Sequence, residues 1–185
     1  GQMATAYISL AKALFARGRF RQAVDQLDLA LTDNPELAEG HFLKGIVLAR
    51  AGDVEAAGRS LDQALELDPK LTGAAIARIQ IHFDLTEFEQ ALAASERALA
   101  FGEDLDRLHL LRGQIFAALH RRDEAVRAYR ESIRHNPNSV ITRYKLGTLL
   151  AEMGMDDEAF EQVLTAKRLS PSSVNNRLAL GDLLA

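Results

Sequence analysis

Residues 52–69 read GDVEAAGRSLDQALELDP, and the pattern of this stretch returns along the chain. Steps of 34 residues from Ala57 meet alanine every time, at Ala23, Ala91, Ala125 and Ala159. The four prolines share one phase of the same period, at Pro35, Pro69, Pro137 and Pro171. A period of this length is typical of stacked units, so we expect an elongated solenoid and not a globule with a single centre.

The stretch predicts a helix over residues 54–67 whose start and end are encoded locally. Its apolar residues follow the three- and four-residue spacing of one helical face, at Ala57, Leu61, Ala64 and Leu65. Asp53 can accept hydrogen bonds from the unpaired amides of the first turn. Asp68 and Pro69 end the helix, because proline cannot extend it and restricts the residue before it.

A second helix precedes this one in each repeat, for example over residues 39–51, and it carries a glycine. These glycines are Gly45, Gly113, Gly147 and Gly181. A glycine inside a helix costs roughly 1 kcal/mol relative to alanine. Its repeated use predicts a close helix contact, so we expect Gly113 to face Ala125 and Gly147 to face Ala159. Glycines with positive φ are expected in the turn between the two helices, at Gly18, Gly52 and Gly154.

These residues resemble the tetratricopeptide repeat, whose signature has a bulky residue, Leu-Gly, a large apolar residue, Ala, Phe and Pro. The matching places hold Tyr7, Leu10-Ala11, Leu14, Ala23, Leu27 and Pro35 in the first repeat; His41, Lys44-Gly45, Leu48, Ala57, Leu61 and Pro69 in the second; His109, Arg112-Gly113, Phe116, Ala125, Tyr129 and Pro137 in the fourth; and Arg143, Leu146-Gly147, Leu150, Ala159, Val163 and Pro171 in the fifth. The resemblance implies an all-α fold, a right-handed superhelical α-solenoid of antiparallel helix pairs.

The repeat pattern covers residues 4–185 as one array. We predict repeats over residues 4–37, 38–71, 72–105, 106–139 and 140–173, and a partial sixth repeat over 174–185. Residues 1–3 look like a cloning remnant. We therefore interpret the chain as a fragment of something longer.

The third repeat departs from the pattern. Arg78 stands in the leucine place, Ile79 in the glycine place, Ser95 in the late aromatic place and Glu103 in the proline place. One interpretation is a compensated exchange, in which Ile79 adds volume and the small residues of the partner helix remove it. The other is a hinge, or a change of superhelical pitch that serves a ligand. Gly102 can still end the helix through a left-handed cap.

The composition and the histidines give no sign of catalysis. The chain has no cysteine, and its formal charge of −4 with a pI near 5.8 argues weakly against nucleic acid as a partner. His41 and His109 occupy the bulky packing place, and His135 suits the carbonyl end of a helix. No nucleophile, base and oxyanion donor come together. We therefore predict a protein that is not an enzyme and that has no cofactor and no metal. No apolar run of the sequence is long enough to span a bilayer. The sequence does not indicate a compartment.

Helical phase leaves a second stripe on the first helix of each repeat, and the resemblance implies that it lines the concave side and binds peptides. We call it the first-helix stripe; its members are Ile8, Lys12, Phe15, Phe42, Ile46, Arg50, Ile76, Gln80, Phe83, Leu110, Gln114, Tyr144, Lys145 and Thr148. Large anchors dominate binding energetics. We therefore expect the largest apolar members, Phe42, Ile76, Phe83 and Tyr144, to be solvent-accessible. Neighbouring Leu43 and Leu111 are expected to pack sideways on the next repeat.

Two specialisations known in the family do not fit these residues. The carboxylate clamp of chaperone-tail receptors would need several cations and an asparagine, but its places hold Ile8, Lys12, Leu43, Gly73 and Ala77. The asparagine ladder of O-linked N-acetylglucosamine transferases would need asparagine along the groove. None of the matching places holds one; they are Ser9, Leu43, Ala77, Leu111, Lys145 and Ala179.

The sequence thus predicts an interaction scaffold that holds an apolar or amphipathic segment of a partner protein, with a composition suggesting a bacterial assembly or secretion system. Two alternatives stay open: a structural array that associates with itself, and the regulatory arm of a larger enzyme. Leu180 and Leu184 would be bare on the partial sixth repeat. We expect that end to find another apolar surface, either on a second copy of the chain or in the groove of a neighbouring molecule.

Overall fold

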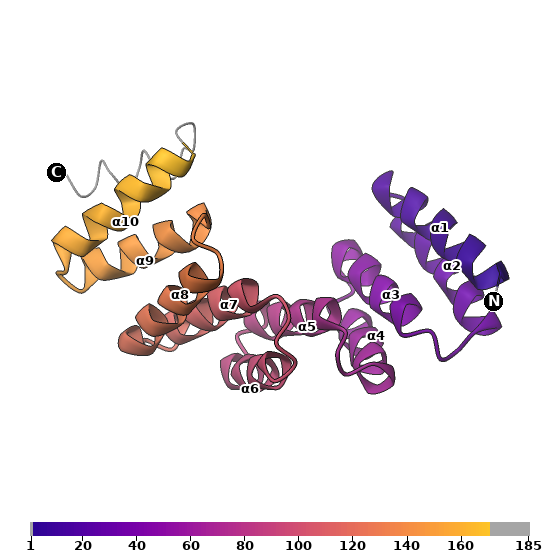
Figure 1. Cartoon of the computed structure of the whole chain (residues 1–185). Coiled ribbons are helices and arrows are strands. Elements are labelled where there is room, and N and C mark those ends of the chain that lie inside the picture. Colours follow the sequence, from indigo (N-terminus) through magenta and orange to yellow (C-terminus); the bar gives the residue numbers. More distant parts are fainter. Residues whose placement is uncertain (1, 171–185) are drawn as a thin grey trace. The chain divides into compact units, whose positions relative to one another are not determined.

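The computed structural model describes residues 2–170, which form ten α-helices and no strand, so the predicted all-α fold is confirmed. The helices are α1 (Gln2–Ala16), α2 (Phe20–Asp33), α3 (Ala38–Ala51), α4 (Val54–Leu67), α5 (Thr72–Asp84), α6 (Phe88–Leu99), α7 (Leu105–Ala118), α8 (Arg122–His135), α9 (Val140–Glu152) and α10 (Asp156–Leu169). Consecutive helices pack as pairs, beginning with α1 and α2 (Figure 1). The predicted sixth repeat, with Leu180 and Leu184, lies outside the described residues.

The chain divides into two compact units. Residues 1–101 contain α1–α6, and residues 102–185 contain α7–α10. The alanine that repeats along the sequence is fully buried in all five pairs, at Ala23, Ala57, Ala91, Ala125 and Ala159. In the first unit, one buried cluster joins α1, α2 and α3, and another joins α4 and α5, so each cluster crosses from one pair to the next, as stacked repeats require.

The helix ends follow the local signals. The side chain of Asp53 accepts a hydrogen bond from the Ala56 amide at 3.1 Å and begins α4. Asn34, Asp68 and Asn136 each precede a proline and have φ between −135° and −144°, outside the helical region. The prolines thus explain why α2, α4 and α8 stop at the same phase of the repeat.

Ion pairs that join one helix pair to the next also recur with the 34-residue period. Lys44 on α3 contacts Asp28 on α2 at 2.6 Å, and one repeat later Arg78 on α5 contacts Asp62 on α4 at 2.7 Å. Each bond joins the second helix of one repeat to the first helix of the next. Lys44 and Arg78 both occupy the leucine place of the repeat signature, so a polar contact between repeats replaces an apolar one.

The glycine inside the first helix lies closest to the large side chain one turn beyond the repeating alanine. A Cβ atom added at Gly113 would collide first with the ring of Tyr129. At Gly147 it would lie 2.6 Å from Cγ2 of Val163 and 3.2 Å from the carbonyl oxygen of Ala159. The glycine mainly makes room for the large side chain one turn beyond the alanine. Helical side chains lean toward the N-terminus of their helix, so this side chain reaches back over the alanine turn.

In the third repeat the sizes of these two positions are exchanged. Ile79 stands in the glycine place and Ser95 in the place of Tyr129 and Val163, and both are fully buried. The Ser95 hydroxyl donates to the Leu92 carbonyl at 2.7 Å, so the small polar residue is satisfied within its own helix. This arrangement supports the compensated exchange. Gly102 has φ +72°, in the left-handed region expected for it.

The turn inside each pair has one residue with positive φ. Gly18, Gly52 and Gly154 have φ of 73°, 91° and 74°, as predicted. The same place holds Thr86, with φ 61°, and His120, with φ 58°. A left-handed conformation is unfavourable for a residue with a Cβ atom, and especially for a β-branched one. The turns of the third and fourth repeats are therefore strained.

Replacing Thr86 with glycine is expected to raise the free energy of unfolding by about 0.5–1 kcal/mol, because it removes this strain. Urea denaturation followed by circular dichroism would measure the change. The matched control is Gly52→Thr, where an added Cβ meets nothing within 4 Å. Its cost of about 1 kcal/mol would therefore report backbone conformation alone. A Thr86→Gly variant that is less stable than the wild-type chain would contradict the prediction.

Candidate functional site

The fourteen residues of the first-helix stripe differ in exposure. Lys12, Arg50, Gln80 and Thr148 are exposed; Phe15, Phe42, Ile46, Phe83, Leu110, Gln114, Tyr144 and Lys145 are partly buried; Ile8 and Ile76 are buried. Ile76 is only 4% exposed, so the expectation that it is solvent-accessible is wrong. It lies one helical turn before the fully buried Ile79 and shares that face of α5. Ile8 similarly lies between Ala4 and Ala11 in the core of the first repeats.

Two aromatic members of the stripe pack in the turns of their own repeats. The rings of Phe15 and Phe20 have centroids 5.7 Å apart, and two repeats later the rings of Phe83 and Phe88 are 5.5 Å apart. Each pair joins the end of a first helix to the start of the second. These contacts account for the partial burial of Phe15 and Phe83 and leave only part of each ring for a ligand.

Phe42 has a different environment. A Cβ atom added at Gly73 would lie 3.1 Å from Cζ of Phe42, so the ring rests on the first turn of α5. Phe42 is also packed against the core cluster around Leu61 and Ile81. It bridges α3 and α5, and we assign most of its buried surface to the contact between repeats.

A small hollow brings three members of the stripe together. A cavity of about 40 Å³ between α1, α2 and α3 is lined by Lys12, Phe15 and Ile46, together with Ala11, Leu27, Leu43 and Val47. Lys12 reaches across to Glu39 at 2.8 Å at this level. So small an apolar hollow beside an exposed cation has room for the tip of an apolar side chain.

A larger hollow lies in the third repeat, and the sequence analysis did not find it. This third-repeat pocket has a volume of about 440 Å³ and is formed by α4, α5, α6 and the segment after α6. Its lining is Asp62, Leu65, Pro69, Ala75, Arg78, His82, Ala94, Arg97, Ala98, Ala100 and Phe101. The residues from α5 stand in the signature places for the bulky residue, the leucine and the large apolar residue. The loss of all three signature residues from α5 is the sequence feature that could have predicted the pocket.

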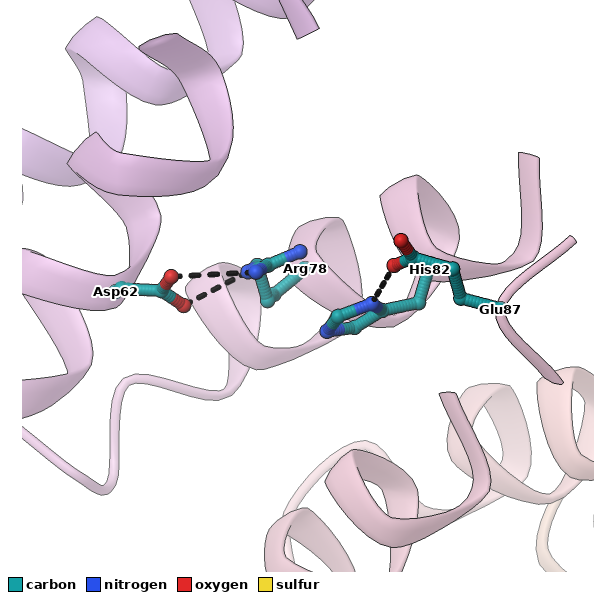
Figure 2. A network of polar contacts seen from close by, with 4 residues as sticks. All are labelled: Asp62, Arg78, His82 and Glu87. Atoms are coloured by element: carbon teal, nitrogen blue, oxygen red, sulfur yellow. Dashed lines mark hydrogen bonds and ion pairs between the residues drawn. The ribbon is translucent and has the colours of Figure 1, made fainter. Parts of the chain in front are cut away.

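Two ion pairs line this region. Asp62 points from α4 to Arg78 on α5, where both carboxylate oxygens accept, at 2.7 and 3.2 Å (Figure 2). Nδ1 of His82 lies 2.6 Å from Oε2 of Glu87 (Figure 2). Glu87 is the residue immediately before α6. The two contacts fix the side chains of Arg78 and His82 along the wall of the third-repeat pocket.

Within residues 2–170, one group of side chains could hold a metal ion. His109 on α7 and Glu131 and His135 on α8 each offer a ligand atom, and these atoms lie within 4.8 Å of one another. The two imidazole rings are stacked, with centroids 5.7 Å apart. Burial lowers the pKa of His109, and the charges of Arg112, His135 and Arg134 act in the same direction against that of Glu131. Glu131 already accepts hydrogen bonds from Arg134, at 3.0 Å from Nε, and this bond competes with a metal.

The sequence profile of the tetratricopeptide repeat matches residues 8–72 and 110–174, so the chain belongs to the tetratricopeptide repeat family. The unmatched residues 73–109 contain most of the third repeat. None of the curated protein sequences compared with the chain matches it. No described helix has the length and apolar character needed to cross a membrane.

Solved structures of other proteins share the fold. PilF of Pseudomonas aeruginosa superposes with a TM-score of 0.86 at 19% identity, over 98% of this chain and 83% of its own. MamA of Desulfovibrio magneticus RS-1 gives 0.81 at 20% identity, over 94% and 98%. YrrB, described as a TPR protein with an unusual peptide-binding site, gives 0.73 at 19% identity, over 95% and 90%. The fold is that of a scaffold for interactions between proteins, and such repeats are typically not catalytic.

Proposed function

We propose that this chain is a non-catalytic scaffold that binds an apolar or amphipathic segment of a partner protein along the first-helix stripe. The observation that carries the proposal is the hollow lined by Lys12, Phe15 and Ile46. Its floor is apolar, and Lys12 at its edge is exposed. The tip of an apolar side chain that enters the hollow would lose its contact with water, while an acidic neighbour could compete with Glu39 for the exposed lysine.

The partner belongs, in this proposal, to a bacterial assembly or secretion system. The support is the composition and the shared fold with PilF and MamA. The peptide-binding site described for YrrB supports a peptide ligand for this fold. The self-associating array remains an alternative, and light scattering across a concentration series separates it from the scaffold.

The test is a pull-down from a bacterial lysate followed by a binding measurement with the purified captured protein. Ile46→Ser combined with Lys12→Ala is expected to weaken that binding at least tenfold. The matched control is Arg59→Ala, which changes an exposed residue of α4. Arg59→Ala should melt within a few degrees of wild type, as substitutions of exposed residues usually do. Because Ile46 is partly buried, thermal melting must also show that the double variant is folded at the temperature of the binding measurement. Equal affinity of the double variant and the control for the captured protein would contradict the proposal.

A further inference from the structure

We propose that the third-repeat pocket is a second docking site, which takes a large apolar side chain flanked by carboxylates in a peptide segment of a partner protein. The pocket uses a different face of the array from the first-helix stripe. Ala75, Arg78 and His82 follow the three- and four-residue spacing of one face of α5. Gln80 and Phe83 of the stripe lie on another face of the same helix.

The pocket lies where the bulky signature residue is missing. That place holds Tyr7, His41, His109 and Arg143 in the other repeats and Ala75 in the third. All four larger residues are partly buried. The pocket beside Ala75 has a volume of about 440 Å³, within the roughly 300–1,000 Å³ common for ligand sites.

The other repeats bridge or narrow this space. The equivalent residues of the fourth repeat line a smaller hollow, of about 250 Å³. In the fifth repeat, Arg143 donates to Gln162 at 2.8 Å, and the equivalent pair in the third repeat is Ala75 and Ala94. In the fourth repeat, His109 stacks on His135. The equivalent of His135 in the third repeat is Phe101, which is 40% exposed. Both bridging contacts are thus absent from the third repeat.

The lining of the pocket indicates the chemistry of its occupant. The floor consists of the buried Ala75, Ala94 and Ala98, and Leu65 is partly buried beside them. Such a floor favours an apolar group, and the exposed Phe101 at the rim offers an aromatic contact. A small polar ligand would leave this surface poorly covered.

Charge at the rim selects an acidic neighbour. Arg78 is bound to Asp62, and His82 is bound to Glu87. Arg97 is exposed and has no hydrogen-bond or ion-pair partner among residues 2–170. A carboxylate next to the apolar side chain can form a charge-assisted hydrogen bond with this guanidinium. A basic peptide would instead bring like charges together.

The test is a titration of the isotope-labelled chain, followed by the amide signals in NMR spectra. The probes are the blocked tripeptides Ac-Glu-Phe-Glu-NH2, Ac-Lys-Phe-Lys-NH2 and Ac-Glu-Ala-Glu-NH2. The first should give saturable shifts around Ala75, Arg97 and Phe101, with a dissociation constant on the order of 1 mM for so small a ligand. The other two should bind at least tenfold more weakly.

Two variants make the test specific. Ala75→His introduces the residue that repeats two and four carry at this place, and it should weaken binding at least tenfold while the chain still melts cooperatively. Arg97→Glu should remove the preference for the acidic peptide. The Ile46→Ser and Lys12→Ala double variant should bind the acidic peptide as wild type does, so failure of the first-helix proposal would be seen separately.

Three results would overturn the proposal. They are equal affinity for the acidic and basic peptides, undiminished binding to Ala75→His, and shifts confined to α1 and α3. Shifts of the pocket signals with protein concentration alone, without peptide, would assign the pocket to a second copy of the chain instead.

Discussion

Replacing Ile79 with glycine is expected to lower the free energy of unfolding by about 3–5 kcal/mol. The isoleucine is fully buried, and the serine in the facing place of α6 cannot fill the cavity that would remain. Glycine inside α5 adds roughly 1 kcal/mol through its backbone freedom, and this amount is included in the range. Urea denaturation of the variant and the wild-type chain would measure this loss of stability.

The exchange can be tested by restoring the family pattern. Ser95→Leu alone should cost about 1–3 kcal/mol through overpacking against Ile79. The double variant Ile79→Gly with Ser95→Leu reproduces the sizes seen at Gly45 and Leu61, so most of the stability should return. A double-mutant cycle gives the coupling between the two positions. Additive losses would show that Ile79 and Ser95 do not compensate each other.

Replacing Gly113 with alanine is expected to lower the free energy of unfolding by about 1–3 kcal/mol, although alanine is the better helix former. The added methyl group would collide with the buried ring of Tyr129. Either the ring must leave its position or α7 must move away from α8, and both changes reduce packing.

Gly58→Ala is the matched control in the same kind of helix. A Cβ atom added at Gly58 meets its nearest neighbour, Cζ of Arg78, at an ordinary 3.6 Å. This variant should gain up to about 1 kcal/mol from helix propensity. Thermal melting of the two variants beside wild type should therefore show shifts of opposite sign. A Gly113→Ala variant as stable as Gly58→Ala would show that the Tyr129 ring yields without cost.

Local signals in the sequence were sufficient for the helices and their pairing. Asp53, the prolines and the turn glycines act within one or two turns of their own position, so a single sequence encodes their effect. The positive φ of Thr86 and His120 was not predicted, although each residue stands one repeat length from a turn glycine. Neither residue favours that conformation, and the surrounding pair of helices imposes it.

The candidate surfaces were harder to predict, because they depend on what neighbouring side chains fill. Helical phase placed Ile76 and Ile8 on an outer stripe, yet both are buried beside residues one turn away. The third-repeat pocket lies beside Ala75, a residue that carries no chemistry of its own. Its significance appears only when the volumes around it are known. The cluster of His109, Glu131 and His135 likewise joins two helices, and spacing along one helix does not reveal it.

The aromatic pairs in the turns of the first and third repeats bear on the order in which the chain folds. Phe15 and Phe20, like Phe83 and Phe88, close a loop of only a few residues, and short loops cost little entropy to close. Contacts of this kind can form before a neighbouring repeat is available. The equivalent places in the fifth repeat hold Ala151 and Asp156, which cannot make such a contact. We therefore expect the first and third helix hairpins to nucleate early, and the fifth to fold onto a repeat that is already formed.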